Sequence, residues 1–521
     1  MNSEGESRVA VDPTLVRALR DRMQADGGEP VVLIETHISW VLLTRQLAYK
    51  LKKPVRLPFV DFSTLAARRQ SCEEEVRLNR RFAPALYLGV ASVCGTTEAP
   101  CIGDGEAIDY AVLMRRFPDG ALLQELLLGG RLEVAQLDGF ARRLAELHAE
   151  APAAAPLSGF GEPEQIDRTV EAVLSELRIA DGERRFDDLF DWVDEQSKAL
   201  RTAWFARLRG GAVRECHGDL HLANVVLVGD ELVAFDCIEF DPALRWIDVL
   251  SDTAFLTMDL KAHGHGQFAH RFLDVYLQRT GDYGGLPVLR CYEVYRALVR
   301  ALAGGLRARA GGIVSQPIDP DYLAVARQMA KGAAHGPRLL ITHGLSGSGK
   351  STVTGQLVEI AGAIRLRSDV ERKRLHGLTA LQSSADQPVD IYTPEATRRT
   401  FARLIECARI ALQAGYPVIV DAAFLRRAER QAFRALAAGL QVPFAILDCR
   451  ASEAQLRRRV AARSARGGDA SEANLDVLER QLAFLEPLDA GERAIALEVA
   501  TDEAVDPMSL AARWISRHRA G

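Results

Sequence analysis

Residues 344–352 read Gly-Leu-Ser-Gly-Ser-Gly-Lys-Ser-Thr and satisfy every fixed position of the pattern G-x-x-x-x-G-K-[S/T]. The run before them, residues 338–343, predicts a short buried strand, and residues 352–360 after them suit a helix. In that setting the glycines let successive backbone N–H groups point at phosphate oxygens. We therefore predict a nucleotide triphosphate site rather than a chance turn. Its predicted nucleotide-binding residues are Gly344, Ser346, Gly347, Ser348, Gly349, Lys350, Ser351 and Thr352.

Two side chains of this stretch carry its chemistry. The Lys350 ammonium group adds positive charge against the β- and γ-phosphates, so we predict it as a catalytic residue as well as a binding one. The Ser351 hydroxyl group is a predicted ligand of Mg²⁺. These two assignments make ATP and Mg²⁺ the expected nucleotide and metal of this half of the chain.

Downstream of this loop, residues 363–367 predict a second strand, and Asp369 follows directly after its carboxyl end. Ligands of open α/β sheets bind outside the carboxyl ends of the strands, which places the Asp369 carboxylate where an acceptor would lie. We predict Asp369 as the base that activates the acceptor hydroxyl, and Arg372 as a clamp for an anionic part of the acceptor. A plain helix N-cap is the alternative role of Asp369.

Three further strands complete this half. Residues 417–421 are apolar until Asp421, whose carboxylate we predict to hold the magnesium and its water shell. Residues 444–449 and 494–499 bring the total to five strands of a parallel sheet. An arginine-rich run between those last two strands suits a mobile lid over the transferring phosphoryl group, with Arg459 and Arg463 as its predicted catalytic residues. A solvated helix face is the alternative.

These features resemble the P-loop small-molecule and polynucleotide kinases, a group that includes gluconate-kinase-like, zeta-toxin-like and polynucleotide-5′-kinase-like enzymes. The resemblance spans about residues 336–517. It rests on the loop at 344–352, on Ser368-Asp369-x-x-Arg372, on Asp421 and on the arginines of the lid. It implies transfer of a phosphoryl group from ATP to a hydroxyl group.

The first half of the chain also contains nucleotide-binding features. In the strand predicted at residues 46–55, Lys50 projects from one face, where a kinase-like fold holds the α- and β-phosphates. The cluster Glu73-Glu74-Glu75 opens the next helical run, and Glu75 is the preferred carboxylate partner of Lys50, with Glu74 as a close alternative. A basic edge strand and an acidic helix start in water would give the same pattern. Residues 110–117 predict a buried strand that leaves into a connector, and Met114 marks where backbone groups would meet adenine.

Residues 216–236 predict a hairpin whose ends carry an aspartate and an asparagine first and a second aspartate afterwards. Phosphoryl transfer needs a carboxylate that takes the proton of the acceptor hydroxyl, and oxygen ligands that hold Mg²⁺ against the phosphates. We assign Asp219 as the base, and Asn224 and Asp236 as metal ligands. A hairpin held by structural carboxylates, as in an inactive kinase, is the alternative.

The stretch His217-Gly218-Asp219…Asn224, together with Asp236, resembles the catalytic core of the aminoglycoside phosphotransferase family. That resemblance covers about residues 31–307. It implies the two-lobed protein-kinase fold, ATP, Mg²⁺ and a hydroxylated small-molecule acceptor. It also implies that Asp248 buttresses the catalytic loop. One departure is the turn at residues 35–39, which has no glycine where protein kinases have a glycine-rich loop, so that Thr36 and Ser39 would have to supply hydrogen bonds there.

Asp252 and Asp259 recur near one face of the helix that follows. Like charges so placed repel one another unless a cation meets them. An acceptor with amino groups would supply such a cation, which makes both residues candidate substrate contacts. A role on the helix surface or in buttressing the fold is the alternative.

Composition limits the other function classes. A length of 521 residues exceeds one domain, and a net charge of −5 disfavours a protein held on nucleic acid by bulk electrostatics. The eight cysteines are scattered with no C-x-x-C pair, which indicates neither a zinc site nor a disulfide framework and favours a reducing, cytoplasmic setting. The first residues are unlike a signal peptide, and no apolar run reaches the ~20 residues of a membrane span.

We therefore predict an α+β two-lobed protein-kinase-like domain followed by an α/β P-loop kinase domain with a five-stranded parallel sheet. The predicted limits are 1–310 for the first domain (small lobe about 1–115, large lobe about 116–310), 311–336 for a linker and 337–521 for the second domain. The whole order resembles a bacterial fusion family.

The predicted function is a two-domain ATP-dependent phosphotransferase that acts on hydroxyl groups of small molecules. We also hypothesise that the halves act in succession on one metabolite. Two alternatives remain open: a polynucleotide 5′-hydroxyl kinase in the C-terminal half, or a ligand-sensing N-terminal pseudokinase that gates a P-loop ATPase. A toxin that acts on nucleotide sugars is a third.

Overall fold

The computed structural model describes residues 12–57, 60–156, 158–181, 186–309, 320–384, 390–466 and 470–517. The chain forms two compact units. Unit 1 contains Met1–Phe140, Glu146–Gly161 and Gly211–Asp252, and unit 2 contains Ala141–Ala145, Glu162–Gly210 and Thr253–Gly521. The chain from Thr253 up to the linker thus belongs to the same compact unit as the P-loop domain. The sequence limits predicted at residues 310 and 337 stay a prediction.

Unit 1 contains a six-stranded antiparallel sheet in the order β1-β2-β3-β8-β6-β7. Its strands are β1 (Val32–Glu35), β2 (Ser39–Leu43), β3 (Leu47–Lys52), β6 (Tyr87–Gly95), β7 (Pro100–Ile102) and β8 (Ala107–Arg115). Helix α2 (Leu65–Asn79) packs on β6 and β8, and Thr64 caps its first turn through a hydrogen bond from Ala67 N. The predicted strand at 46–55 ends at Lys52, close to Pro54, which has no N–H to give to a ladder.

The predicted catalytic hairpin is present in unit 1. A 3-10 turn, η2 (Leu222–Asn224), leads into β10 (Val225–Val228), which pairs antiparallel with β11 (Glu231–Ala234). A second short pair, β9 (Val213–Glu215) with β12 (Trp246–Asp248), holds the chain on both sides of this hairpin. The other short elements of this region are β4 (Arg56–Leu57), β5 (Val60–Asp61), α1 (Thr14–Gly27), α3 (Leu123–Leu128) and α7 (Pro242–Arg245).

Helices dominate the part of unit 2 that precedes the P-loop. They are α5 (Pro163–Asp181), α6 (Asp187–Arg209), α9 (Gly266–Thr280), η3 (Tyr283–Gly285), α10 (Leu286–Arg309) and α11 (Tyr322–Ala330), while α4 (Val134–Glu150) and α8 (Val249–Ala262) contribute residues to both units. Residues 281–285 separate α9 from α10, and Gly281 adopts a left-handed backbone with φ of 72° and ends α9.

The C-terminal half builds the predicted five-stranded parallel sheet, in the order β14-β15-β13-β16-β17. Its strands are β13 (Leu339–His343), β14 (Ile364–Arg367), β15 (Val418–Asp421), β16 (Phe444–Arg450) and β17 (Ala496–Ala500). The last strand begins later than the predicted residue 494 because α18 (Ala490–Ala494) forms first, capped by the Asp489 carboxylate, which accepts a hydrogen bond from Glu492 N.

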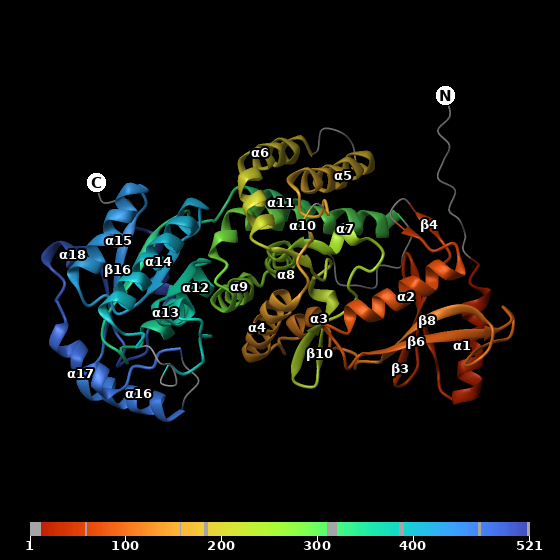
Figure 1. Cartoon of the computed structure of the whole chain (residues 1–521), viewed down its shortest axis with the longest axis horizontal. Helices are drawn as coiled ribbons and strands as arrows, with labels where there is room; N and C mark the ends of the chain where they lie inside the picture. Colours follow the sequence, from red (N-terminus) through yellow and green to blue (C-terminus); the bar gives the residue numbers. More distant parts are fainter. Residues whose placement is uncertain are drawn as a thin grey trace. The chain divides into compact units, whose positions relative to one another are not determined.

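Helices cover both faces of this sheet, as the blue and teal part of Figure 1 shows. Helices α12 (Lys350–Ala361) and α19 (Pro507–Ile515) form one apolar cluster with the strands, and α14 (Pro394–Gln413) and α15 (Arg427–Gly439) also contact the sheet. The remaining helices are α13 (Ser368–Leu375), α16 (Glu453–Arg466) and α17 (Leu475–Phe484). Because all five strands run parallel, their carboxyl ends meet at one edge, which is where the phosphate-binding loop follows β13.

Among the residues that the structure describes, no helix combines the length and the apolar content that a bilayer span requires.

Acidification is expected to weaken unit 2 through His270. Burial, followed by the charge of Lys261, lowers the pKa of this imidazole to about 4 from an ordinary value of 6.5. Between these values the unfolded chain binds the proton that the folded chain excludes, so stability is full above pH 6.5 and falls as the pH falls toward 4. We expect a loss of about 1.4 kcal/mol by pH 5.5 and about 3 kcal/mol in full.

Urea unfolding of unit 2 at pH values from 7.5 to 4.5 checks this expectation. His270→Gln, which cannot take up the proton, should flatten the pH dependence by the same amount. Equal pH slopes for the wild type and His270→Gln would contradict the assignment.

Candidate active sites

The first candidate site lies in unit 1, where α2, β3 and the segment after β11 meet. The Lys50 ammonium group donates to Glu75 Oε1 at 2.9 Å and forms an ion pair with Asp236. The structure thus brings together three residues that the sequence assigned to nucleotide and metal binding. The Asp236 side chain is 42% exposed, whereas that of Glu75 is fully buried. Asp236 is therefore accessible to a ligand, and Glu75 holds the lysine from inside.

A second lysine on the same face of β3 was not predicted as a site residue. The fully buried Lys52 pairs with Glu75 and, at 2.5 Å, with Glu239. Burial alone would raise the pKa of the Glu75 carboxyl group, but the Lys50 and Lys52 ammonium groups outweigh it and lower that pKa to about 2. Glu75 therefore stays charged between two lysines. The alternating positions of Lys50 and Lys52 in the sequence were a signal for this arrangement.

Replacing Lys52 by alanine is expected to destabilise unit 1 by about 3–5 kcal/mol, because the change leaves the buried Glu239 carboxylate without its charge partner. Chemical unfolding followed by near-UV circular dichroism measures this loss. Arg22→Ala is a control in the same unit, since Arg22 pairs with Asp26 in water, and it should leave the unfolding midpoint unchanged. A Lys52→Ala midpoint equal to that of the control would contradict the prediction.

The catalytic loop places Asp219 and Asn224 side by side. Asn224 Nδ2 donates to Asp219 Oδ2 and to the Asp219 carbonyl oxygen, each at 2.9 Å. Gly218 has φ of +88°, and a Cβ atom there would lie 2.8 Å from the Leu244 carbonyl oxygen. The glycine of His217-Gly218-Asp219 is therefore required by backbone conformation and by space. The Asp219 side chain remains 35% exposed, so an acceptor can reach it.

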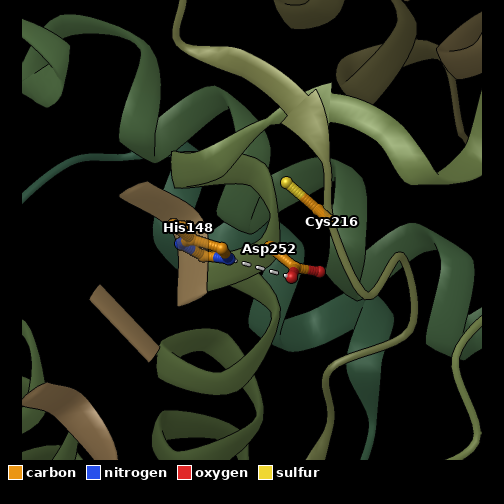
Figure 2. Close-up of side chains that lie close together, drawn as sticks. All are labelled: His148, Cys216 and Asp252. Atoms are coloured by element: carbon orange, nitrogen blue, oxygen red, sulfur yellow. Dashed lines mark hydrogen bonds and ion pairs between the residues drawn. The ribbon is translucent and has the colours of Figure 1, made fainter. Parts of the chain in front are cut away.

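Asp252 fixes the backbone of this loop through hydrogen bonds, and Figure 2 shows its side chain beside those of His148 and Cys216. His217 N donates to Asp252 Oδ2 and Gly218 N donates to Oδ1, both at 2.9 Å, while His148 Nε2 lies 3.2 Å from Oδ2. Burial would raise the pKa of the Asp252 carboxyl group, but its hydrogen bond with His148 and neighbouring histidine charge lower it to about 2. Cys216 Sγ lies within 4.8 Å of the other two donor atoms of this cluster.

The two acidic residues considered as substrate contacts are both buried. Asp252 is fully buried and binds the catalytic loop, and Asp259, which lies in unit 2, is 1% exposed and accepts a hydrogen bond from the Tyr322 hydroxyl group at 2.7 Å. These contacts favour the buttressing role that the sequence left open. Sequence reasoning gave the buttress of the catalytic loop to Asp248, which stays a prediction, and the structure shows that Asp252 binds the loop backbone directly.

Two regions that the sequence assigned to nucleotide contact are the turn with Thr36 and Ser39, and the strand with Met114. The Thr36 hydroxyl group donates to the Ser39 carbonyl oxygen at 3.0 Å and accepts from Ser39 N at 2.9 Å, so it closes its own turn. Met114 lies in β8 between β3 and β6, with its side chain in the apolar cluster of the small lobe. Adenine contact by the backbone near Met114 stays a prediction.

The second candidate site is the loop between β13 and α12 in unit 2. Its glycines are fixed by φ and by space: Gly344 has φ of +142° and Gly347 has φ of +85°, and added Cβ atoms would meet the carbonyl oxygens of Cys449 and Leu456. Lys350 Nζ donates to the carbonyl oxygens of Gly344 and Leu345, at 2.9 and 2.7 Å. The Lys350 side chain thus lies over the loop and binds its backbone.

Burial lowers the pKa of the Lys350 ammonium group, and the nearby carboxylate of Asp421 opposes that shift. Asp421 is 5% exposed and ends β15, in register with Arg367 of β14. Its Oδ2 accepts a hydrogen bond from Thr354 Oγ1 at 3.4 Å and lies 3.7 Å from Arg367 Nε. The carboxylate and the Ser351 hydroxyl group are oxygen donors of the kind that Mg²⁺ prefers.

On the acceptor side, Asp369 lies in the first turn of α13. The N-cap of that helix is Arg367 and makes no side-chain capping hydrogen bond, so the N-cap alternative for Asp369 is not realised. Arg372 is 8% exposed; its Nη1 donates to the Ile391 carbonyl oxygen at 3.1 Å, and the guanidinium lies 5.2 Å from the centre of the Tyr392 ring. Within the described chain, no acceptor is found for the buried Arg372 Nε.

The two predicted lid arginines are tied to different parts of the site. Arg459 Nη1 donates to Thr501 Oγ1 at 2.9 Å and to the Gly347 carbonyl oxygen at 3.3 Å, so it supports the phosphate loop. Arg463 Nη2 donates to the Ala473 carbonyl oxygen at 2.8 Å. A charge role toward the phosphoryl group stays a prediction for both residues.

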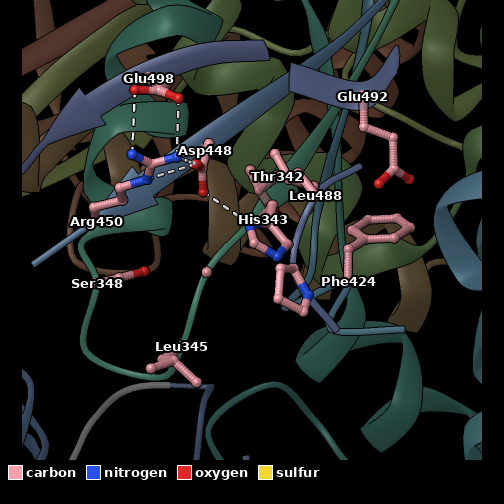
Figure 3. A network of polar contacts seen from close by, with 12 residues as sticks. Thr342, His343, Leu345, Ser348, Phe424, Asp448, Arg450, Leu488, Glu492 and Glu498 are labelled. Atoms are coloured by element: carbon pink, nitrogen blue, oxygen red, sulfur yellow. Dashed lines mark hydrogen bonds and ion pairs between the residues drawn. The ribbon is translucent and has the colours of Figure 1, made fainter. Parts of the chain in front are cut away.

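Sequence reasoning missed the polar network that anchors β13 directly before the loop (Figure 3). His343 Nδ1 lies 2.7 Å from Asp448 Oδ1, and Arg450 Nε donates to Asp448 Oδ2 at 2.7 Å. Arg450 also pairs with Glu498 on β17. Burial raises the pKa of the Asp448 carboxyl group, but the contacts with His343 and Arg450 outweigh it, so the net shift is downward. The acidic residue at the carboxyl end of the run 444–449 was the available signal.

Comparisons with known proteins agree with this geometry. Residues 48–298 match the model of the phosphotransferase enzyme family, and residues 339–488 match that of an AAA domain. An uncharacterised protein of Mycobacterium tuberculosis (strain H37Rv) is 30% identical over 454 residues, which are 85% of this chain and 88% of that protein, and a Mycobacterium bovis protein matches equally. Both predicted family resemblances are confirmed by the two model matches.

Solved structures that resemble parts of the chain include two kinases. A gluconokinase from Sinorhizobium meliloti is 24% identical, covers 34% of this chain and 90% of its own, and has a TM-score of 0.24. A choline/ethanolamine kinase family protein from Mesorhizobium loti is 14% identical, covers 59% and 88%, and has a TM-score of 0.35.

Proposed function

This chain belongs to the family that the mycobacterial proteins represent, and from that premise we propose that it is a two-site ATP-dependent phosphotransferase. Each site would transfer the γ-phosphoryl group of ATP to a hydroxyl group of a small molecule. The observation that supports the proposal lies in unit 1, which contains the Lys50, Glu75 and Asp236 contacts and the Asp219 and Asn224 pair. The two sets are joined where Phe235 N, next to Asp236, donates to the Asn224 carbonyl oxygen at 3.0 Å.

The residues of the first site suit this reaction. The Asp219 carboxylate would accept the proton of the acceptor hydroxyl, and its hydrogen bond from Asn224 orients it. Asn224 and Asp236 offer oxygen ligands for Mg²⁺. Lys50, steadied by Glu75, would pair with the α- and β-phosphates. When bound, magnesium neutralises charge on the phosphate oxygens.

The second site would perform the same reaction with other residues. The loop N–H groups and Lys350 would hold the β- and γ-phosphates, while Ser351 and Asp421 would hold the metal. Asp369 would receive the acceptor proton, and the partly unsatisfied guanidinium of Arg372 would bind an anionic part of the acceptor. In both sites, alignment of the reactants and preorganised positive charge would supply most of the catalysis.

A phosphorylation screen of a metabolite extract tests the proposal. The wild type, Asp219→Ala and Lys350→Ala would each be incubated with ATP and Mg²⁺, and products read by the mass of an added phosphoryl group. We expect at least one product that depends on Asp219 and one that depends on Lys350. The same experiment with 5′-hydroxyl oligonucleotides separates a polynucleotide kinase from a small-molecule kinase. Binding of one ATP equivalent per chain, with unit 1 unreactive, would refute the two-site proposal.

A further inference from the structure

Strand β14 is an edge strand of the parallel sheet, and within unit 2 helix α9 lies against it and against α12. One arginine of β14 joins the two sides. Arg365 Nη2 donates to Asp274 Oδ2 of α9 at 2.6 Å, and Nε donates to Oδ1 at 3.3 Å. Its third nitrogen, Nη1, donates to the Ser351 carbonyl oxygen at 3.1 Å. The guanidinium thus connects a carboxylate of α9 with the first turn of the P-loop helix.

Both members of this ion pair are largely buried, so the two charges depend on each other for compensation. The Asp274 side chain is 5% exposed and that of Arg365 is 12% exposed. A forked carboxylate–guanidinium pair fixes direction as well as distance, and loss of one partner leaves the other charge buried without compensation. Arg365 consequently depends on Asp274 for its orientation toward the loop.

The polar contacts continue from Arg365 to the predicted magnesium residues. Arg365 Nη1 reaches Thr354 Oγ1 at 3.5 Å, and the same hydroxyl group donates to Asp421 Oδ2 at 3.4 Å. Ser351, whose carbonyl oxygen Arg365 binds, is the other predicted metal ligand. Both metal-binding positions of the P-loop site are therefore linked through one guanidinium to a single carboxylate of α9.

Helix α9 also approaches the P-loop domain closely at both of its ends. Gly362 has φ of +62°, and a Cβ atom there would lie 2.9 Å from His270 Nε2. At the other end Gly281 has φ of +72°, and its added Cβ atom would lie 2.6 Å from Arg374 Nε. Arg271 pairs with Glu359 at 2.6 Å between these points. The close approach at both ends restricts movement of Asp274 relative to Arg365.

We propose that Asp274 is a positioning residue of the P-loop site, which acts through Arg365 on the magnesium-binding turn. Helix α9 lies within residues 48–298, the region that matches the phosphotransferase family, so this region would contribute a structural part of the second site. This inference rests on the proposed function of the P-loop half. It also offers a physical reason for the fusion, because α9 supplies the carboxylate that orients Arg365.

The test compares Asp274→Asn with Arg271→Ala in the full-length chain. Arg271→Ala removes an ion pair between the same surface of α9 and Glu359, which lies in the last turn of α12, so it serves as the matched control. The measurements are Mg²⁺ titrations of Lys350-dependent ATP turnover, with kcat and KM for ATP obtained separately. We expect Asp274→Asn to raise the Mg²⁺ concentration for half-maximal turnover about tenfold, and Arg271→Ala to change it less than twofold.

Arg365→Lys is the second test variant, for the case that Asp274→Asn does not fold. It keeps the positive charge but loses the two-pronged contact with the Asp274 carboxylate, so it should raise the Mg²⁺ requirement in the same way. A wild-type Mg²⁺ response in a folded Asp274→Asn or Arg365→Lys protein would overturn the inference. If the wild type shows no turnover that depends on Lys350, the proposed function of this half fails instead. Mg²⁺-dependent binding of a fluorescent ATP analogue then decides the positioning role by the same comparison.

Discussion

Replacement of Lys350 by alanine is expected to lower phosphoryl transfer at the P-loop site by about 10²–10³-fold, the effect of removing one preorganised donor from a charged transition state. In the structure the ammonium group rests on the carbonyl oxygens of Gly344 and Leu345, within reach of the phosphates that the loop would hold. Nucleotide binding should also weaken, since the same charge faces the ground-state phosphates.

The fold should survive this change. Burial lowers the pKa of Lys350, which means that the folded protein disfavours its charged form. The charge of Lys350 therefore does not stabilise the folded state. We expect the unfolding free energy to change by about 1 kcal/mol or less. The measurement is turnover of a Lys350-dependent acceptor, combined with urea unfolding. Retained turnover in a protein that still folds would remove the P-loop from the mechanism.

Asp219-dependent product formation is the internal control for this variant, because Asp219 belongs to unit 1 and Lys350 to unit 2. It should persist in Lys350→Ala. Loss of both products with an intact fold would mean that one reaction passes through both sites. That result would favour the hypothesis of successive action on one metabolite over independent activities.

The parts of the fold that could be predicted were those with a local cause. The run before Gly344 contains the apolar stretch Leu339-Leu340-Ile341, as expected of a central parallel strand, and β13 is buried throughout. The hairpin around Asn224 followed from short β-rich runs and a Gly-Asp turn. In these segments, neighbouring residues determine the conformation, so a single sequence was sufficient.

The environment of charged residues was not predictable in the same way. Lys50 and Lys52 with Glu75 gave the same pattern as a solvated strand and helix start, but in the structure they form a buried network with Glu239. Whether such charges face water depends on which elements cover them. That information lies in residues more than a hundred positions away.

Contacts between distant segments were the second limit. Asp274 and Arg365 are 91 positions apart, and His343 and Asp448 are 105 apart. In neither pair does a periodic or motif signal link one member to the other, because an ion pair requires only that two side chains meet in space. Arg459 illustrates the reverse case: its spacing suggested a lid, while its hydrogen bonds hold Thr501 and the loop backbone.

Replacement of Asp219 by asparagine is expected to lower turnover at the first site by about 10²–10⁴-fold, the usual contribution of a general base. Asparagine keeps the size of the side chain and can still accept the hydrogen bond from Asn224, so the loop should stay in place. Lys50 and Asp236 remain to bind nucleotide and metal. The loss should therefore appear in kcat, with the KM for ATP nearly unchanged.

Asp236→Asn is the informative comparison for this variant. It removes a charge from a predicted metal ligand and from the ion pair with Lys50, so it should raise the requirement for Mg²⁺ and ATP as well as lower kcat. Steady-state kinetics of the Asp219-dependent product at varied Mg²⁺ concentrations distinguish the two patterns. If Asp219→Asn left turnover intact while Asp236→Asn still abolished nucleotide binding, unit 1 would bind ATP without transferring it, and the ligand-sensing reading would replace the enzymatic one. A loss for Asp219→Asn that is confined to kcat would support the enzymatic function, because a nucleotide sensor requires its nucleotide-binding residues but does not require a base that faces an acceptor.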